Sequence, residues 1–160
     1  LHVTLVFLGH LPASEIERAA VALRETHAIA GPVPIRLERI PVPVPRRRPR
    51  VVAFDVESPA AAEVHADLVA RLAAAGLHEP DGRPYWPHLS VARVRGDPGR
   101  GGGAKRLVEG PPTLTEGTGH TFGSVRIALY RSQLGSDGAS PSALQAFELP
   151  PGEGAADEVI

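Results

Sequence analysis

Six stretches of the chain have the pattern of β-strands. Hydrophobic and polar positions alternate most clearly over residues 1–8 and 33–40, as they do in strands that bury one face. The remaining strand-like stretches are residues 51–57, 86–95, 120–134 and 142–150. We expect a bulge at Gly123 and a hairpin turn over 135–140, so that the last two stretches pair with each other.

Two further stretches have helical spacing instead. Ser14 and Glu17 form a capping box ahead of a helix that ends before Gly31. The Ser-Pro pair at 58–59 suits the N-cap and first position of a second helix, which ends at Gly76. Apolar side chains recur at helical spacing in both, at Ile16, Ala20, Leu23, Val64, Leu68, Leu72 and Ala75.

The order of these elements predicts an α+β fold that arose by duplication. Each half of the chain has a strand bearing a His-x-Thr or His-x-Ser motif, a helix and hairpin strands. We therefore expect a two-lobed, pseudo-symmetric fold with mostly antiparallel sheets, helices on the outside and a cleft between the lobes. Residues 1–149 would form this single domain, and residues 150–160 a flexible acidic tail.

Composition narrows the class of protein only modestly. The chain has 160 residues, of which 42% are hydrophobic and 22% charged, as in an ordinary globular domain. Its net charge of -1 does not indicate a nucleic-acid binder. The basic residues are arginines except for Lys105, and four of them crowd into residues 45–50. Arginine forks suit phosphate, but an Arg-, Ala- and Pro-rich composition accounts for the cluster equally well.

The sequence lacks the signatures of several functional classes. Cysteine is absent, which removes disulfides, a thiol nucleophile and Cys-ligated zinc. No apolar run approaches the roughly 18 residues of a membrane span, and no signal peptide is visible. We accordingly expect a cytoplasmic monomer with no membrane partner. The Gly-rich segment 99–106 lacks the Gly-Lys-Ser/Thr ending of a phosphate-binding loop, and a short helix is expected around 104–109.

One four-residue motif occurs twice, as HVTL near the start of the chain and as HLSV in its second half. Residues i and i+2 of a strand point to the same face. His2 therefore projects beside Thr4, and His88 beside Ser90, while the intervening apolar residues face a core. If the two strands lie close together, two imidazoles and two hydroxyls converge on one small volume.

Such a set suits in-line cleavage of a phosphodiester. A neutral imidazole accepts a proton from the attacking oxygen and an imidazolium donates one to the leaving oxygen, and the ordinary pKa of about 6.5 allows both roles. The hydroxyls would hold the non-bridging phosphate oxygens. A 2′,3′-cyclic phosphate is a natural target, because its strained ring needs no metal. A single His-x-Thr is usually structural or exposed, and it is the repetition that favours catalysis.

At these residues the chain resembles the 2H phosphoesterases, and most closely the bacterial and archaeal RNA 2′,3′-cyclic phosphodiesterases of the 2′-5′ RNA ligase family. The resemblance extends over residues 1 to about 149. The matching segments are LHVTLVFLGHLP, PRRRPRVVAFDV, PHLSVARV and ALYRSQLGSDG. Members normally have a strand and a helix ahead of the first motif, so we expect that the given sequence lacks its native N-terminus.

The resemblance implies a role for each motif residue. His2 would be the general acid and His88 the general base, an assignment that the near-symmetric motifs do not make by themselves. Thr4 and Ser90 would hold the phosphate, with Ser90 standing where Thr is commoner. Arg93 matches a substrate-contacting position, although strict alternation would turn it away from His88 unless a twist or bulge re-aims it.

Other residues are weaker candidates for substrate binding. Arg48 and Arg50, with the neighbouring arginines 46 and 47, would form an electrostatic rim for RNA, and solvated loop charge is the equal alternative. Tyr130 would stack on a base. Tyr85 and Trp86 are further stacking candidates, although packing in or beside the core is the favoured interpretation of Trp86. The histidine and aspartate at 65 and 67 do not form a metal-ligand set.

Together these observations predict an enzyme that needs no cofactor. It would hydrolyse RNA 2′,3′-cyclic phosphate ends to 2′-phosphomonoesters and run the reverse 2′-5′ ligation weakly. One alternative is the same chemistry on a small nucleotide such as ADP-ribose cyclic phosphate. Another is a non-catalytic module that binds RNA ends, and a third is an acid–base enzyme with an unrelated substrate, which a requirement for metal would favour.

Overall fold

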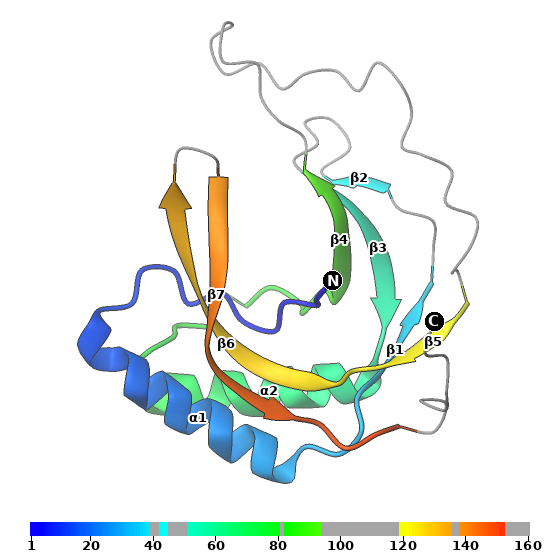
Figure 1. The fold of residues 1–160 in the computed structure, drawn as a ribbon. Helices are drawn as coiled ribbons and strands as arrows, with labels where there is room; N and C mark the ends of the chain where they lie inside the picture. The colour runs from blue at the N-terminus through cyan, green and yellow to red at the C-terminus, as the bar shows by residue number, and fades with distance from the viewer. Residues whose placement is uncertain (39–41, 45–50, 81, 94–118, 136–137, 153–160) are drawn as a thin grey trace, which may run out of the picture. The chain divides into compact units, whose positions relative to one another are not determined.

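The computed structural model describes residues 1–38, 42–44, 51–80, 82–93, 119–135 and 138–152 (Figure 1). The chain divides into two compact units, each assembled from segments of both halves of the sequence. The first unit comprises residues 1–4, 35–58 and 86–121. The second unit comprises residues 5–34, 59–85 and 122–160. The units therefore do not correspond to the first and second halves of the chain.

The first unit is built around an antiparallel sheet. Its strands are β1 (Pro34–Leu37), β2 (Val42–Val44), β3 (Val51–Glu57) and β4 (His88–Arg93), and β5 (Thr121–Gly123) begins in this unit at Thr121 and continues into the second unit. β3 pairs antiparallel with β4 along one edge and with β1 and β2 along the other, and β5 joins β1. In Figure 1, β3 and β4 run side by side as a curved pair. This pairing places the second histidine motif next to the central strand.

The core of the first unit lies on one face of this sheet. Along β3 the buried residues Val52, Phe54 and Val56 alternate with Asp55 and Glu57, which are less buried. The core cluster comprises Leu37, Phe54, Val56 and Leu89, with Val3, Ile35 and Val91 packed against it. Burying a side chain such as Phe54 contributes about 1.5–3 kcal/mol. One face of β3 is thus apolar, and its other face carries the carboxylates of Asp55 and Glu57.

In the part of the chain that the structure describes, the second unit contains two helices and a long hairpin. Its elements are the 3-10 turn η1 (Ala13–Glu15), α1 (Ile16–Ile29), α2 (Pro59–Ala74), β6 (Arg126–Gly135) and β7 (Gly138–Glu148). Figure 1 shows α1 and α2 lying alongside each other. Leu23 of α1 and Val64, Leu68 and Leu72 of α2 meet Ile127 of β6 in a shared core. The apolar stripes that predicted the two helices are the surfaces that form this core.

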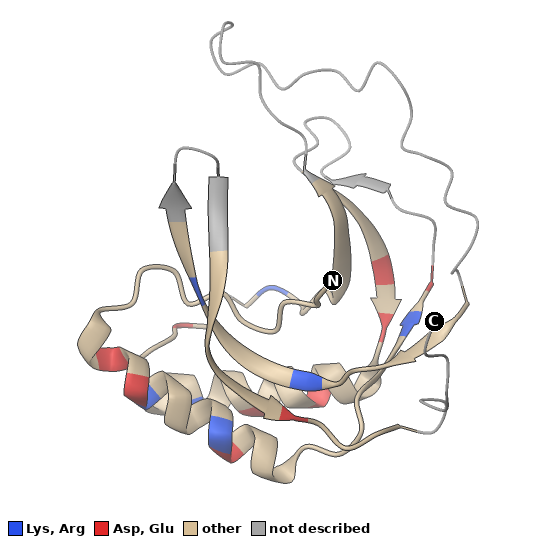
Figure 2. Cartoon of the chain, in the orientation of Figure 1, with Lys and Arg blue, Asp and Glu red and all other residues tan. Residues whose placement is uncertain are grey.

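A polar network links α1 to α2. The hydroxyl of Thr26, which is only 1% exposed, donates to Asp67 Oδ2 at 2.6 Å. Arg71 Nε donates to the same oxygen at 2.8 Å, and its Nη1 reaches Glu25 Oε2 at 2.6 Å. The hydrogen bond from Arg71 lowers the pKa of the Asp67 carboxyl, and partial burial opposes this effect. Figure 2 shows acidic and basic residues interspersed along both helices.

The second helix follows the prediction at both ends. α2 begins at Pro59 and stops where Gly76 adopts a φ of 68°. The Gly76 N–H donates to Ala73 O and the Leu77 N–H to Leu72 O, both at 2.9 Å, which is a Schellman closure. A residue with a side chain is strained at this backbone angle, so glycine is suited to the position.

The start of the first helix differs from the prediction. The capping box is not formed, because η1 precedes α1 and Ser14 lies inside that turn instead of at the cap position. Glu15 is the N-cap residue of α1, with no side-chain capping bond.

Two strand predictions need correction, and one strand was not predicted. Residues 1–8 do not form a strand, and only Val3 makes a bridge. The stretch 120–134 forms two strands, because Ser124 N bonds to Val33 O and Val125 O accepts from Leu149 N, both at 3.0 Å. Residues 42–44, where the sequence pattern predicts no strand, form the short strand β2. The predicted helix at 104–109 and residues 153–160 of the predicted tail lie outside the described residues.

The prediction of an α+β fold with mostly antiparallel sheets is confirmed. β1–β3, β2–β3, β3–β4 and β6–β7 all pair antiparallel. Within the described part of the chain, neither helix has the length and hydropathy needed to cross a membrane.

Candidate active site

A single antiparallel bridge between Val3 and Leu89 joins the two histidine motifs. In this register position 2 lies opposite position 90, and position 4 opposite position 88. Val3 and Leu89 belong to the core of the first unit. Because side chains alternate along an extended chain, His2, Thr4, His88 and Ser90 share the opposite face. The bridge therefore places positions 2, 4, 88 and 90 next to one another on this face, and the convergence of their side chains on one substrate stays a prediction.

The four side chains remain open to a substrate. His2 and Thr4 are exposed, whereas His88 and Ser90 are half-buried in β4. Each half-buried residue has a neighbour on β3, since Asp55 pairs with His88 and the fully buried Ala53 pairs with Ser90. The carboxylate of Asp55 thus lies on the same face of the sheet as the His88 imidazole.

The His88 ring is held by its own chain segment. Its Nδ1 lies 2.9 Å from the carbonyl oxygen of Trp86. A carbonyl oxygen can only accept, so Nδ1 carries the hydrogen of this bond. In the neutral imidazole, Nε2 is then the basic nitrogen. This is the protonation pattern that a general base acting through Nε2 requires.

Trp86 makes two further contacts in the same place. Its indole stacks on the His88 imidazole with ring centroids 4.2 Å apart and planes inclined by 16°. The indole N–H donates to Asp55 Oδ1 at 2.8 Å. Of the favoured expectation that Trp86 packs in or beside the core, packing inside the core is wrong, because the residue is 41% exposed and stacks on the imidazole.

Tyr85 occupies the more sheltered position and belongs to the second unit. It stacks on His65 with centroids 4.0 Å apart, and burial raises the pKa of its phenol to about 12. His65 also contacts the Leu5 carbonyl oxygen through Nδ1 at 2.9 Å. These contacts are consistent with a structural role for Tyr85.

A β-bulge changes the alternation just beyond the second motif. Ala53 pairs with Ser90, but the next residue of β3, Val52, pairs with Ala92, so Val91 is the extra residue. Beyond the bulge, Arg93 pairs with Val51, which shares the β3 face of Ala53. Position 93 therefore lies on the face of the sheet that carries positions 88 and 90. The bulge that Arg93 requires is present, and the residue's contact with substrate stays a prediction.

For the remaining substrate-binding candidates, contact with a substrate stays a prediction. Arg48 and Arg50, like the arginines at 46 and 47, lie outside the described residues. Tyr130 lies on β6 in the second unit, is 47% exposed and accepts a hydrogen bond from Arg126 Nη2 at 3.3 Å. Its role in stacking on a base also stays a prediction.

Sequence reasoning did not identify Asp55 as part of the site. A signal was available, because Asp55 is a carboxylate inside the otherwise apolar stretch VVAF-D-V of β3. An acidic residue at such a position indicates a nearby donor. The identity of the donor, the Trp86 indole, depends on the pairing of β3 with β4.

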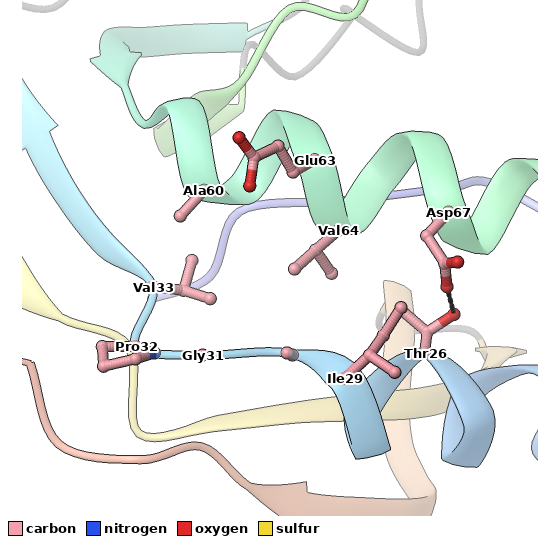
Figure 3. Close-up of a pocket in the computed structure, with 10 residues that line it drawn as sticks. Thr26, Ile29, Gly31, Pro32, Val33, Ala60, Glu63, Val64 and Asp67 are labelled. Carbon is pink, nitrogen blue, oxygen red and sulfur yellow. Dashed lines mark hydrogen bonds between the residues drawn. The ribbon is translucent and has the colours of Figure 1, made fainter.

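The second unit contains a cavity of about 210 Å³ between α1 and α2 (Figure 3). Val33 and Val64 line it together with Thr26 and Asp67, whose side chains bond to each other. These polar groups join the two helices and do not form a nucleophile–base pair. Among the residues that the structure describes, no three His, Cys, Asp or Glu side chains are grouped as a metal site requires.

Solved structures with this arrangement define the class of the fold. TT0787 of Thermus thermophilus matches 92% of this chain and 77% of its own, with a TM-score of 0.69 and 27% identity. E. coli LigT in its apo form matches 93% of this chain and 76% of its own, with a TM-score of 0.65 and 20% identity. A second E. coli LigT structure, complexed with 3′-AMP, matches with a TM-score of 0.65 and 22% identity, over 92% of this chain and 76% of its own. The chain thus has the two-lobed α+β fold of the LigT structures.

The sequence assigns the family within this class. The model of the 2′-5′ RNA ligase superfamily matches residues 1–109, a range that includes both histidine motifs. The chain belongs to the 2′-5′ RNA ligase superfamily. A curated relative, the RNA 2′,3′-cyclic phosphodiesterase of Bacillus subtilis (strain 168), is 27% identical over 92 residues. That match covers 58% of this chain and half the length of the relative.

Proposed function

We propose that this protein hydrolyses 2′,3′-cyclic phosphates at RNA ends to 2′-phosphomonoesters, using its two histidine motifs as acid and base. The observation that carries the proposal is the Val3–Leu89 bridge, which aligns positions 2 and 4 with positions 90 and 88 within the first unit. Membership of the 2′-5′ RNA ligase superfamily and the name of the B. subtilis relative support the same reaction.

The reaction requires one proton acceptor and one proton donor. His88 Nε2 accepts a proton from a water molecule as the water oxygen attacks phosphorus. The bond from phosphorus to the 3′ oxygen breaks, and protonated His2 delivers its proton to that leaving oxygen. The products are a 2′-phosphomonoester and a free 3′ hydroxyl. The Nδ1 contact of His88 supports its role as the base, because it leaves Nε2 free to accept.

The hydroxyls and an arginine would stabilise the phosphate. Thr4 and Ser90 donate hydrogen bonds to its non-bridging oxygens, where negative charge increases in the transition state. Arg93, whose position lies on the same face beyond the bulge, would add a positive charge. No step requires a cofactor or a metal ion, since the two imidazoles perform both proton transfers.

The decisive experiment uses an end-labelled RNA with a 2′,3′-cyclic phosphate, incubated in EDTA. The parent protein should open the ring to a 2′-phosphate, and His88→Ala and His2→Ala should each lower the rate about 10²–10⁴-fold. His10→Ala is the matched control, because His10 is exposed and outside both motifs. Absence of turnover by the parent at every RNA length would contradict the proposal.

The same assay separates the alternatives. If turnover does not rise with oligonucleotide length, the substrate is a small cyclic nucleotide. If the parent shows no turnover and both histidine variants still bind the RNA normally, the protein is a binding module for RNA ends. Activity that appears only when a divalent metal is restored would indicate a different chemistry.

A further inference from the structure

Trp86 contacts the catalytic imidazole in two ways. Its side chain stacks on the His88 ring at 4.2 Å, and its carbonyl oxygen lies 2.9 Å from Nδ1. The indole is in turn fixed by its N–H bond to Asp55 Oδ1 at 2.8 Å. Asp55 and His88 are paired across β3 and β4. The three residues therefore form a closed set of contacts anchored on two strands.

This arrangement controls the two ways in which a histidine ring can be misplaced. An imidazole bonded through one nitrogen can still tilt about that bond, and it can turn over so that Nδ1 and Nε2 exchange places. A flat ring 4.2 Å away and nearly parallel opposes the tilt. The carbonyl favours the orientation with Nδ1–H toward the chain. Stack and bond together direct Nε2 away from the chain segment.

We propose that Trp86, held by Asp55, is a positioning residue that fixes the ring plane and tautomer of His88. The inference rests on the proposed function, in which Nε2 is the proton acceptor. Trp86 itself does not touch the reacting atoms. Its removal should therefore reduce the rate of the chemical step more than it weakens substrate binding.

The kinetic test compares variants that retain or lose the stacked ring. Trp86→Leu should lower kcat by about 10–100-fold with KM changed less than about 3-fold. Trp86→Phe retains a flat ring and should recover most of that loss. Asp55→Asn retains an acceptor oxygen for the indole and should stay near the parent, whereas Asp55→Leu should follow Trp86→Leu. Phe122→Leu, which removes another exposed aromatic side chain, is the control.

A second measurement does not depend on turnover. Nitrogen chemical shifts of the His88 ring should report a single Nδ1–H tautomer in the parent at a pH where the ring is neutral. In Trp86→Leu the backbone carbonyl is still present, yet the tautomers should mix, because without the stack the ring can tilt out of line with that oxygen and the Nδ1–H bond weakens. Thermal unfolding confirms that the variants are folded.

The outcomes distinguish the two proposals. An active parent with an unaffected Trp86→Leu variant overturns the role of Trp86 and leaves the proposed function standing. An inactive parent whose His88 tautomers mix only in Trp86→Leu supports the positioning role and contradicts the proposed function. An unchanged tautomer ratio in Trp86→Leu overturns the positioning role whatever the activity.

Discussion

Val3 and Leu89 pair across an antiparallel bridge, and both side chains enter the same apolar core. This burial sets the register of the polar residues on either side of them. A shift of one residue would turn His2 or His88 toward the core, because side chains alternate at every step. The alignment of the candidate catalytic groups therefore depends on two hydrophobic residues that take no part in the chemistry.

Truncating the Leu89 side chain should lower the stability of the folded protein, because this side chain packs in the core that sets the register. The residue is 7% exposed and packs with Phe54 and Val56, so Leu89→Ala should reduce the free energy of unfolding by about 2–5 kcal/mol. Urea unfolding measures the loss. Val125→Ala removes a side chain that is 75% exposed and should change stability by less than about 0.5 kcal/mol. Equal effects of the two substitutions would contradict the placement of Leu89 in the core.

The dependence of kcat/KM on pH should be bell-shaped with a maximum near neutrality. The base must be neutral, so the rate rises with pH on the acid side, and the acid must be protonated, so the rate falls on the alkaline side. In the residual activity, His88→Ala should lose the acid limb and His2→Ala the alkaline limb. A rate that rises steadily to strongly alkaline pH in the parent would argue against a mechanism with two histidines.

Ser90 should tolerate substitution by threonine but not by alanine. Threonine retains the hydroxyl and favours a strand, so Ser90→Thr should keep activity within about 3-fold of the parent. Ser90→Ala removes one donor to the developing charge and should lower kcat by about 10²-fold. Single-turnover rates on the cyclic-phosphate RNA provide the comparison. If Ser90→Ala is as active as Ser90→Thr, the hydroxyl does not contact the phosphate.

Arg93 should contribute to substrate binding from beyond the bulge. A hydrogen bond to a charged group is worth about 1.5–3 kcal/mol, so Arg93→Ala should lower kcat/KM by about 10–100-fold. Arg24→Ala is a matched control, because Arg24 lies on α1 with its side chain 51% exposed. Deleting Val91 removes the bulge and should reproduce the Arg93→Ala loss without removing the arginine. Full activity in the deletion variant would show that position 93 does not act from this face.

Asp67 should make the stability of the second unit sensitive to acid. Its pKa in the folded protein is lowered from 3.8 by the hydrogen bond from Arg71, against the opposing effect of burial. A lowered folded pKa means that the stabilisation is fully present above the unfolded pKa, near 3.9, and is lost as pH falls through the lower folded value. Asp67→Asn should therefore destabilise at pH 7 by about 1 kcal/mol, and this difference from the parent should shrink below pH 4.

Urea unfolding between pH 2 and pH 7 measures this effect. Glu17→Gln is the control, because the Glu17 side chain is 74% exposed. A constant difference between Asp67→Asn and the parent over the whole range would mean that the charge of Asp67 does not contribute.

Local features of the sequence were sufficient to predict several of the helices and strands. The Ser-Pro start, apolar stripe and terminal glycine of α2 act over a few residues, and the prediction is confirmed at both ends. The alternation in β3 likewise reflects its own residues. The strand expected at 1–8 was wrong, because an alternating segment also needs a partner strand, and here only Val3 has one.

The sequence by itself determined the composition of the candidate site, since the i, i+2 spacing pairs each imidazole with a hydroxyl wherever the segment is extended. Only the tertiary structure decided that the motifs meet through Val3 and Leu89, that Val91 bulges to turn position 93, and that Trp86 contacts both His88 and Asp55. The physical reason is that spacing along one strand is local, whereas register, bulges and cross-strand contacts depend on which distant segment supplies the hydrogen bonds and the shared core.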